Sequence, residues 1–335
     1  MINDKCSVII PCFNAEKWIA EAIDSLLAQT YPNLEIIVID DGSSDRSLEI
    51  VKSYGDRLIY RRILNQGANT ARNLGFTLAT GRYIQYLDAD DYLLPDKIAK
   101  QVACLQNTGA DFVYGDWRYQ HHSNNGDVYL DEIRVCGDKD DFLYSLLAND
   151  RWSNLAPILF SRSIVSKVSW DESLSAAQDR DFLFSVMVAG AKGIYQSGCD
   201  SIYRMHSGTS ISTASKLRWF KSHCLIMEKA EQILQSQGLF SAKYQQALAK
   251  AYWEMGKEYL YSSCGDNQQH QKSDRQEIQY QTYARILNKV NQLSPNIFIQ
   301  HKSKLYTACH HLLGYQLAER LSYIFNYYKT IIINY

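Results

Sequence analysis

Short apolar runs alternate with amphipathic stretches through the first 120 residues of the chain. Runs of β-branched and aromatic residues predict strands at 6–10, 35–40, 58–64, 83–87 and 111–119, of which 6–10, 35–40 and 83–87 should be buried. Between these runs the apolar residues recur at helical spacing, and Pro or Asn marks several helix starts. This alternation predicts an α/β fold, in which right-handed connections wind a mostly parallel sheet with helices on both faces.

The pattern changes twice further along the chain. After about residue 120 it becomes turn-rich and less regular, and from about residue 213 to the end it consists of long helical runs. We therefore expect a wound domain over residues 1–212 and a helical C-terminal region over 213–335. The last helical run is tyrosine-rich and ends apolar, and its sparse Lys and Arg favour a packed helix over one lying on a membrane.

Composition narrows the class of protein. Hydrophobic residues make up 46% of the 335 residues, which is enough for a sizeable core. The net charge of −1 gives no general attraction to nucleic acid or anionic lipid. The eight cysteines show neither C-x-x-C pairs nor zinc spacing, and no run approaches the roughly 20 apolar residues that span a bilayer. We expect a soluble, cytoplasmic protein with reduced cysteines.

Acidic residues follow two of the predicted strands. Asp40 and Asp41 end one, and Asp88, Asp90 and Asp91 end another. Because the carboxyl ends of parallel strands meet at one edge of a sheet, where ligands bind in open α/β folds, these acids should lie near each other. A bare acidic edge repels phosphate, but it can bind phosphate through Mg²⁺ or another hard cation. An isolated D-x-D, however, is more often a solvated acidic loop after a strand.

Phosphate-binding glycine motifs are missing. Neither G-x-G-x-x-G nor G-x-x-x-x-G-K-[ST] follows a predicted strand, so the sequence supports neither a dinucleotide fingerprint nor a P-loop. Arg72 and Asn73 instead bring a planar donor fork and an amide near the acidic edge, although both could be solvated residues of a surface helix.

Two later segments carry further candidates. Asp179 and Asp181 lie at a predicted helix start, where they could cap the helix or accept a proton from a hydroxyl. Arg204 and His206 follow the last predicted strand and could face a phosphate and a metal, although a lone histidine is more often structural.

Five segments together resemble the family 2 glycosyltransferases. In chain order they are CSVIIPCFNAEKWIAEAIDSLLAQTYPNLEIIVIDDGSSDRS, NQGANTARNLG, ATGRYIQYLDADD, QDRDF and YRMHSGTSIS. The resemblance covers roughly residues 5–212 and implies an inverting, metal-dependent, hexosyltransferase-like enzyme with a GT-A fold. Its nucleotide-sugar half would be about 1–119 and its acceptor half about 120–212. Nothing comparable covers residues 213–335.

The resemblance implies a donor site. Pro11 and Phe13 would flank the nucleotide base. Asp41 would bond the base, and Arg72 would lie close to it. We count Asn73 among the residues that bind the nucleotide sugar, for its amide near the same edge.

The resemblance also implies a metal site for Mn²⁺ or Mg²⁺. Asp90 would be the direct ligand that joins the cation to the diphosphate. Asp88 would touch the ribose or a water on the metal. His206 matches a position that reaches the diphosphate or the metal in related enzymes.

The general base implied by the resemblance is Asp179. It matches the acid of the family's Glu-Asp motif, whose first position is Gln178 here. Arg180 replaces the usual aromatic residue, which could alter contacts with the acceptor. A divalent cation would offset the charge that develops on the diphosphate while Asp179 takes a proton from the acceptor hydroxyl, and one displacement inverts the anomeric centre.

The acceptor and the cellular setting follow from the family. We expect a UDP-linked donor, by family frequency, and a carbohydrate or lipid-linked acceptor in polysaccharide or glycolipid assembly, with possible peripheral association with the inner face of the membrane. Trp117 and Trp152 could stack on a sugar, but core packing is the more common role of a tryptophan.

Two alternative functions remain from sequence alone. A metal-dependent nucleotidyltransferase would also place acids on an α/β sheet, but it should carry a Gly-rich basic loop where this chain has PCFNAEKW. A catalytically degenerate nucleotide-sugar binding protein is the other, although both Asp90 and Asp179 are retained.

Overall fold

The computed structural model describes residues 4–122, 127–134, 140–148, 154–205, 216–262 and 285–294. The chain divides into two compact units, Met1–Leu239 and Phe240–Tyr335. The boundary expected near residue 212 lies outside the described residues, and the division of the chain there stays a prediction.

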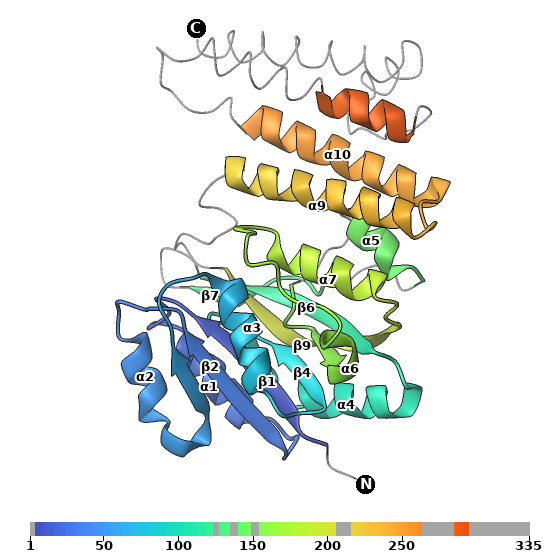
Figure 1. The fold of residues 1–335 in the computed structure, drawn as a ribbon. Coiled ribbons are helices and arrows are strands. Elements are labelled where there is room, and N and C mark those ends of the chain that lie inside the picture. The colour runs from blue at the N-terminus through green and yellow to red at the C-terminus, as the bar shows by residue number, and fades with distance from the viewer. Residues whose placement is uncertain are drawn as a thin grey trace, which may run out of the picture. The chain divides into compact units, whose positions relative to one another are not determined.

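A nine-stranded sheet forms the centre of the first unit, counted over the described residues (Figure 1). Its order is β3-β2-β1-β4-β8-β6-β9-β5, with β7 paired to β6. The strands are β1 Cys6–Cys12, β2 Leu34–Asp40, β3 Ile59–Arg62, β4 Tyr83–Tyr86, β5 Tyr92–Leu93, β6 Phe112–His122, β7 Val128–Leu130, β8 Ile158–Ser161 and β9 Gly193–Met205.

The sheet is parallel at one side and mixed at the other. Strands β3, β2, β1 and β4 run parallel. Strand β8 lies antiparallel between β4 and β6, and β9 runs parallel to β6. The wound, mostly parallel sheet expected from the alternating pattern is therefore confirmed.

Helices cover both faces of the sheet, also as expected. Alternate residues of β1 face opposite ways, so that Val8 and Ile10 enter one core and Ile9 enters the other. The first core contains residues of α1 Ile19–Leu27, α2 Ser47–Ser53 and α4 Lys97–Thr108. The second contains residues of α3 Ala68–Leu78, α5 Phe142–Ala148, α6 Arg162–Val165 and α7 Gln178–Val188.

Helix α3 lies unusually close to the sheet. A Cβ atom on Gly75 would lie 2.4 Å from Cγ2 of Ile9 and 3.5 Å from Cγ1 of Ile39, so only a hydrogen fits there. This close approach fixes the depth of the helix that carries Arg72.

Helices dominate the C-terminal part of the described chain, as predicted. Helix α9, Lys216–Ser236, belongs to the first unit, where Lys229 Nζ donates to Asp181 Oδ1 of α7 at 2.6 Å. Helix α10, Ala242–Ser262, and a helical segment at 285–293 belong to the second unit. None of the helices in the described part of the chain has the length and apolar character needed to cross a membrane.

Candidate active site

The carboxyl ends of β2, β1 and β4 lie side by side, because these strands are neighbours in the sheet. Pro11 is buried in β1 opposite Ile39, and Phe13 follows that strand with 48% of its surface exposed. Asp41 follows β2, and the D-x-D segment follows β4. The edge therefore presents an exposed aromatic ring beside acidic residues. This arrangement suits a ligand that carries both an aromatic base and a charged group.

The Asp41 carboxylate fastens the loop that leads into α3. It accepts the N–H of Gln66 at 2.7 Å and that of Gly67 at 2.8 Å, while its own N–H donates to the Cys12 carbonyl. Gly67 has a φ of 96°, which a residue with a side chain rarely adopts. Asp41 thus holds the loop in a conformation that places α3, and with it Arg72, at the sheet edge.

Asp40 is a buried acid that the sequence alone does not separate from its neighbour Asp41. Its carboxylate is fully buried, and neither oxygen has a hydrogen-bond donor among the described residues. The Nε of Arg62 lies 3.4 Å from Oδ2. With none of its surface exposed, this carboxylate is closed to a ligand, and Arg62 compensates its charge. Its position in the acidic pair that ends β2 is the only sequence signal for it.

Arg72 connects the D-x-D segment to the candidate base. Its Nη2 donates to Asp88 Oδ1 at 2.8 Å and lies 3.9 Å from Asp179 Oδ1. Its Nη1 donates to Gln178 Oε1 at 3.1 Å, and the guanidinium lies 4.4 Å from the ring centre of Trp170. The buried guanidinium of Arg72 is therefore shared by Asp88, which follows β4, and by residues of α7. Its contact with the Trp170 ring fixes the plane of the guanidinium.

Asn73 lies one position further along α3 and contacts a different loop. Its Nδ2 donates to the Trp170 carbonyl at 3.0 Å and to Glu172 Oε1 at 2.8 Å, and its Oδ1 accepts the Trp170 N–H. These contacts position the ring of Trp170 against Arg72. Whether Asn73 also binds a nucleotide sugar stays a prediction.

Arg204 of β9 forms hydrogen bonds to the turn that carries the D-x-D segment. Asp91 is buried, and its Oδ1 accepts the N–H of Arg204 at 2.9 Å. The Nη1 of Arg204 donates to the Asp90 carbonyl at 2.9 Å, and its Nη2 lies 2.6 Å from Glu21 Oε2. Burial raises the pKa of Asp91, and the carboxylates of Asp90 and Asp88 raise it further. Three acids crowded in one turn are the electrostatic setting that a cation relieves.

Asp179 lies in the first turn of α7, two positions after a strained residue. Ala177 has a φ of 55°, in the left-handed region that residues with side chains seldom adopt. Burial raises the pKa of Asp179 to about 6; Arg72 acts to lower it and Asp88 to raise it. Its side chain remains 21% exposed, so a ligand can reach it. A carboxylate with a raised pKa beside a cation can accept a proton near neutral pH.

The neighbours of Asp179 have structural partners. Arg180 is buried and donates from Nε to the Leu146 carbonyl and from Nη2 to the Leu147 carbonyl, both at 3.0 Å. It therefore binds the C-terminal carbonyls of α5, and these contacts give no support to a role in acceptor binding. Trp117 is 6% exposed and packs in the second core, as is common for a tryptophan. His206 and Trp152 lie outside the described residues.

The described residues suit a cation that a ligand helps to hold. They contain no cluster of three or more His, Cys, Asp or Glu side chains able to bind a metal ion. Asp88 and Asp90 supply two carboxylates from one turn, and Mg²⁺ is ordinarily held by one or two carboxylates together with substrate phosphates and water. The donor set therefore fits a cation completed by a diphosphate.

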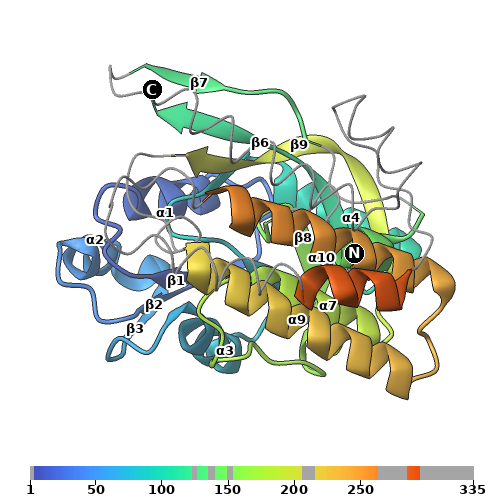
Figure 2. The same cartoon turned by 90° about the horizontal axis from the view of Figure 1, so that it is seen from above.

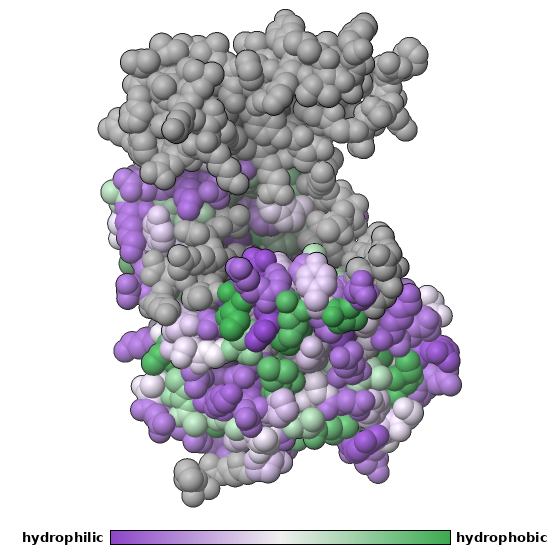
Figure 3. Space-filling model, turned by 180° about the vertical axis from the view of Figure 1, so that it is seen from behind, coloured by the Kyte–Doolittle hydropathy of each residue, from purple (hydrophilic) through white to green (hydrophobic). Residues whose placement is uncertain are grey.

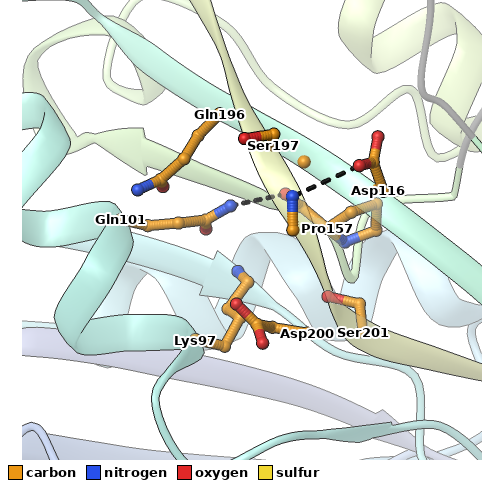
Figure 4. A pocket seen from close by; sticks show the side chains of 10 residues that line it. Lys97, Gln101, Asp116, Pro157, Gln196, Ser197, Asp200 and Ser201 are labelled. Carbon is orange, nitrogen blue, oxygen red and sulfur yellow. Dashed lines mark hydrogen bonds between the residues drawn. The ribbon is translucent and has the colours of Figure 1, made fainter.

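A small, partly open cavity lies elsewhere, between α4 and the bulged part of β6 and β9 (Figure 4). Its volume is about 10 Å³, enough for one water and far too small for a nucleotide. Lys97 lines it, and its Nζ donates to Gln85 Oε1. Burial lowers the pKa of Lys97 to about 7. This cavity is polar packing and not the ligand site.

Comparison with known proteins gives one family. A model described as "Glycosyl transferase family 2" matches residues 7–168. The chain is 27% identical over 248 residues to glycosyltransferase GlyA of Streptococcus pneumoniae, covering 70% of this chain and 35% of GlyA. It is 34% identical over 200 residues to the uncharacterized glycosyltransferase RP339 of Rickettsia prowazekii, covering 53% of this chain and 57% of RP339. The chain thus spans between a third and three-fifths of these relatives.

Two solved structures share the fold at low sequence identity. TarS 1–349 of S. aureus, in complex with UDP-GlcNAc, has a TM-score of 0.66 at 19% identity, covering 94% of this chain and 90% of that one. The mannosyltransferase PcManGT of Pyrobaculum calidifontis, in complex with GDP-Man and Mn²⁺, has a TM-score of 0.51 at 18% identity, covering 96% and 88%. Together with the family model, these likenesses confirm the GT-A type fold and the family resemblance found in the sequence.

Replacing Asp41 tests its role in holding the loop before α3. The amide of Asp41→Asn keeps one acceptor oxygen, but its NH₂ group would face a backbone N–H. We expect the free energy of unfolding to fall by about 2 kcal/mol, measured by urea denaturation. Asp56→Asn, which changes an exposed carboxyl in the turn after α2, should alter it by less than about 0.5 kcal/mol. Equal stability of the two variants would contradict this role.

Proposed function

We propose that this chain, of which residues 7–168 match the family 2 glycosyltransferase model, transfers a sugar from a nucleoside-diphosphate sugar to an acceptor hydroxyl with inversion at the anomeric carbon. The observation that carries the proposal is the position of Arg72. Its Nη2 lies 2.8 Å from Asp88 of the D-x-D segment and 3.9 Å from Asp179. Asp88, which would bind the donor, and Asp179, which would accept the proton of the acceptor, therefore lie close enough to act on a donor and an acceptor that are bound together.

The donor is a UDP-sugar in this proposal. Phe13 and Pro11 flank the base, and Asp41 offers an acceptor to its N–H groups. The support for UDP is that TarS structures contain UDP or UDP-GlcNAc. PcManGT, with GDP-Man, is the counterexample within the same fold.

Asp90 and Asp88 would hold Mn²⁺ or Mg²⁺ beside the diphosphate, and His206 is the third candidate ligand. A bound divalent cation supplies Lewis-acid stabilisation of the charge that develops on the leaving diphosphate. Arg204 bonds the Asp90 carbonyl and Asp91 bonds the Arg204 N–H, so the turn that carries both ligands is rigid.

Asp179 takes the proton of the acceptor hydroxyl as that oxygen attacks the anomeric carbon. Its raised pKa makes it a better base than an ordinary aspartate, while the nearby Arg72 favours the ionised form. Attack and departure on opposite faces of the sugar occur in one displacement, so the chain needs no nucleophile of its own. The acceptor is a carbohydrate or a lipid-linked carbohydrate, and the setting we propose is cytoplasmic assembly of a polysaccharide or glycolipid.

Asp179→Asn should abolish transfer while keeping donor binding. The amide has the same shape but cannot accept the proton, so we expect transfer to fall about 10²- to 10⁴-fold, with UDP-sugar affinity within about twofold. Product formation and donor titration measure the two effects. Glu49→Gln, at an exposed site on α2, is the control and should leave both unchanged. Transfer by Asp179→Asn at the wild-type rate would show that another group is the base, and donor binding without turnover in the wild type would favour a degenerate binding protein.

The pH profile should report the same carboxylate. A base is active when deprotonated, so a pKa of about 6 predicts that kcat/KM for transfer is level above pH 7 and falls about tenfold per unit below pH 6. Bound Mn²⁺ would lower the pKa and move this acid limb to lower pH. The residual activity of Asp179→Asn should lack the limb; a limb of the same midpoint in that variant would assign it to a different group.

Asp90→Ala tests the metal without measuring activity. A ligand of the native state raises the melting temperature, by about 5 °C or more at a hundredfold excess over its Kd. For the wild type, we expect UDP with Mn²⁺ to stabilise more than UDP with EDTA. Asp90→Ala should lose this difference. If EDTA makes no difference to the wild type, Asp90 is not a metal ligand.

A further inference from the structure

Four rings form a continuous series on one face of the sheet. Tyr203 of β9 lies opposite Tyr119 of β6, with ring centres 5.4 Å apart, and Tyr119 lies 5.7 Å from His121. His121 lies opposite Tyr129 of β7, with the rings stacked at 4.9 Å and 16°. We call Tyr203, Tyr119, His121 and Tyr129 the aromatic ladder.

The ladder begins at the candidate active site. Tyr119 and Tyr203 pack against the second core, which also contains residues of α3 and α7, so the ladder is on the same face as Arg72 and Asp179. Burial raises the pKa of the Tyr203 phenol, and four carboxylates of the site raise it further. They are Asp91, Asp88, Asp90 and Asp179. From Tyr203 the rings continue through Tyr119 and His121 of β6 to Tyr129 of β7. Figure 2 shows β7 beside β6.

Polar groups accompany the rings. The guanidinium of Arg134 lies 4.5 Å from the centre of the Tyr119 ring, and its Nη2 donates to Asp131 Oδ2 at 2.9 Å. The same carboxylate oxygen lies 3.5 Å from Nε2 of His121, and Oδ1 accepts the Tyr119 N–H. Exposure increases outward, and Tyr129 is 56% exposed.

This combination of groups favours a carbohydrate over a lipid or an apolar peptide. A sugar ring presents one C–H face, which packs on an aromatic ring, and a rim of hydroxyls, which need planar donors and acceptors such as guanidinium and carboxylate. A lipid surface would need a continuous apolar area. Asp131 and Arg134 instead place opposite charges among the rings. On the face of the molecule drawn in Figure 3, apolar side chains are likewise interspersed with polar ones.

We propose that the aromatic ladder is the acceptor subsite and that the acceptor is an oligosaccharide, which stacks on Tyr129 and His121 and bonds Asp131 and Arg134 through its hydroxyls. The acceptor end nearest Tyr203 would then present its hydroxyl to Asp179. This proposal rests on the proposed glycosyl transfer. It assigns acceptor binding to the four ladder residues on β6, β7 and β9. Trp117, also on β6, is buried and would not contact the acceptor.

Three tetrasaccharides serve as probes: cellotetraose, chitotetraose and maltotetraose. Each is titrated into the full chain by calorimetry with UDP and Mn²⁺ present. We expect at least one to bind, and we expect Tyr129→Ala to weaken that binding about tenfold, whereas Tyr129→Phe, which keeps the ring, stays within twofold. Leu130→Ala is the matched control. Leu130 is also exposed on β7, but it lies opposite Gln120 and therefore on the other face.

The outcomes separate the alternatives. Binding lost in Tyr129→Ala and kept in Leu130→Ala supports the proposal. It is overturned if no tetrasaccharide binds the wild type, if Tyr129→Ala binds as the wild type does, or if Tyr129→Ala and Leu130→Ala lose binding equally. UDP-sugar binding by the wild type is measured in the same series. Tetrasaccharide binding without any nucleotide-sugar binding would reject the proposed function and keep the carbohydrate subsite; the reverse would reject only the subsite.

Discussion

The candidate active site depends on one buried cation. Arg72 is 4% exposed, and a guanidinium taken out of water is costly unless carboxylates compensate it. Burial lowers its pKa, but Asp88 and Asp179 more than restore it. Because Asp88 follows β4 and Asp179 begins α7, the cation joins the parallel half of the sheet to the mixed half. If either carboxylate moved away, the buried guanidinium of Arg72 would keep only one anionic partner.

The rest of the site is a set of supports for that arrangement. Asp41 holds the loop before α3, Asn73 holds the loop that carries Trp170, and Arg204 holds the turn of the D-x-D segment from the other side. Each support bonds backbone groups, so it fixes chain position more than charge. A preorganised site of this kind has little reorganisation left to do when a charged ligand enters.

The sequence predicts best what local chemistry decides. The runs at β1 and β2 are continuous β-branched segments, so they could be predicted as buried strands, and the acids beside their ends could be placed with them. Strand β9 lies in the less regular part of the pattern after residue 120, because its bulged pairing with β6 interrupts the alternation that marks a strand. The inner position of Arg180 and the support from Arg204 could not be predicted, because their partners, the carbonyls of α5 and of Asp90, are brought near only by the tertiary fold.

Gly75 allows α3 to pack directly on the sheet, because it has no side chain to hold the helix away. Gly75 lies three positions after Arg72 on the same helix face, and it is the point at which α3 touches Ile9. Since a helix moves as a stiff rod, the separation of α3 from the sheet at this point sets how far the guanidinium reaches toward Asp88. The contact between Gly75 and Ile9 therefore helps to set the geometry of the Arg72–Asp88 ion pair one helical turn away. A larger residue at position 75 would disturb that ion pair, although Gly75 itself takes no part in it.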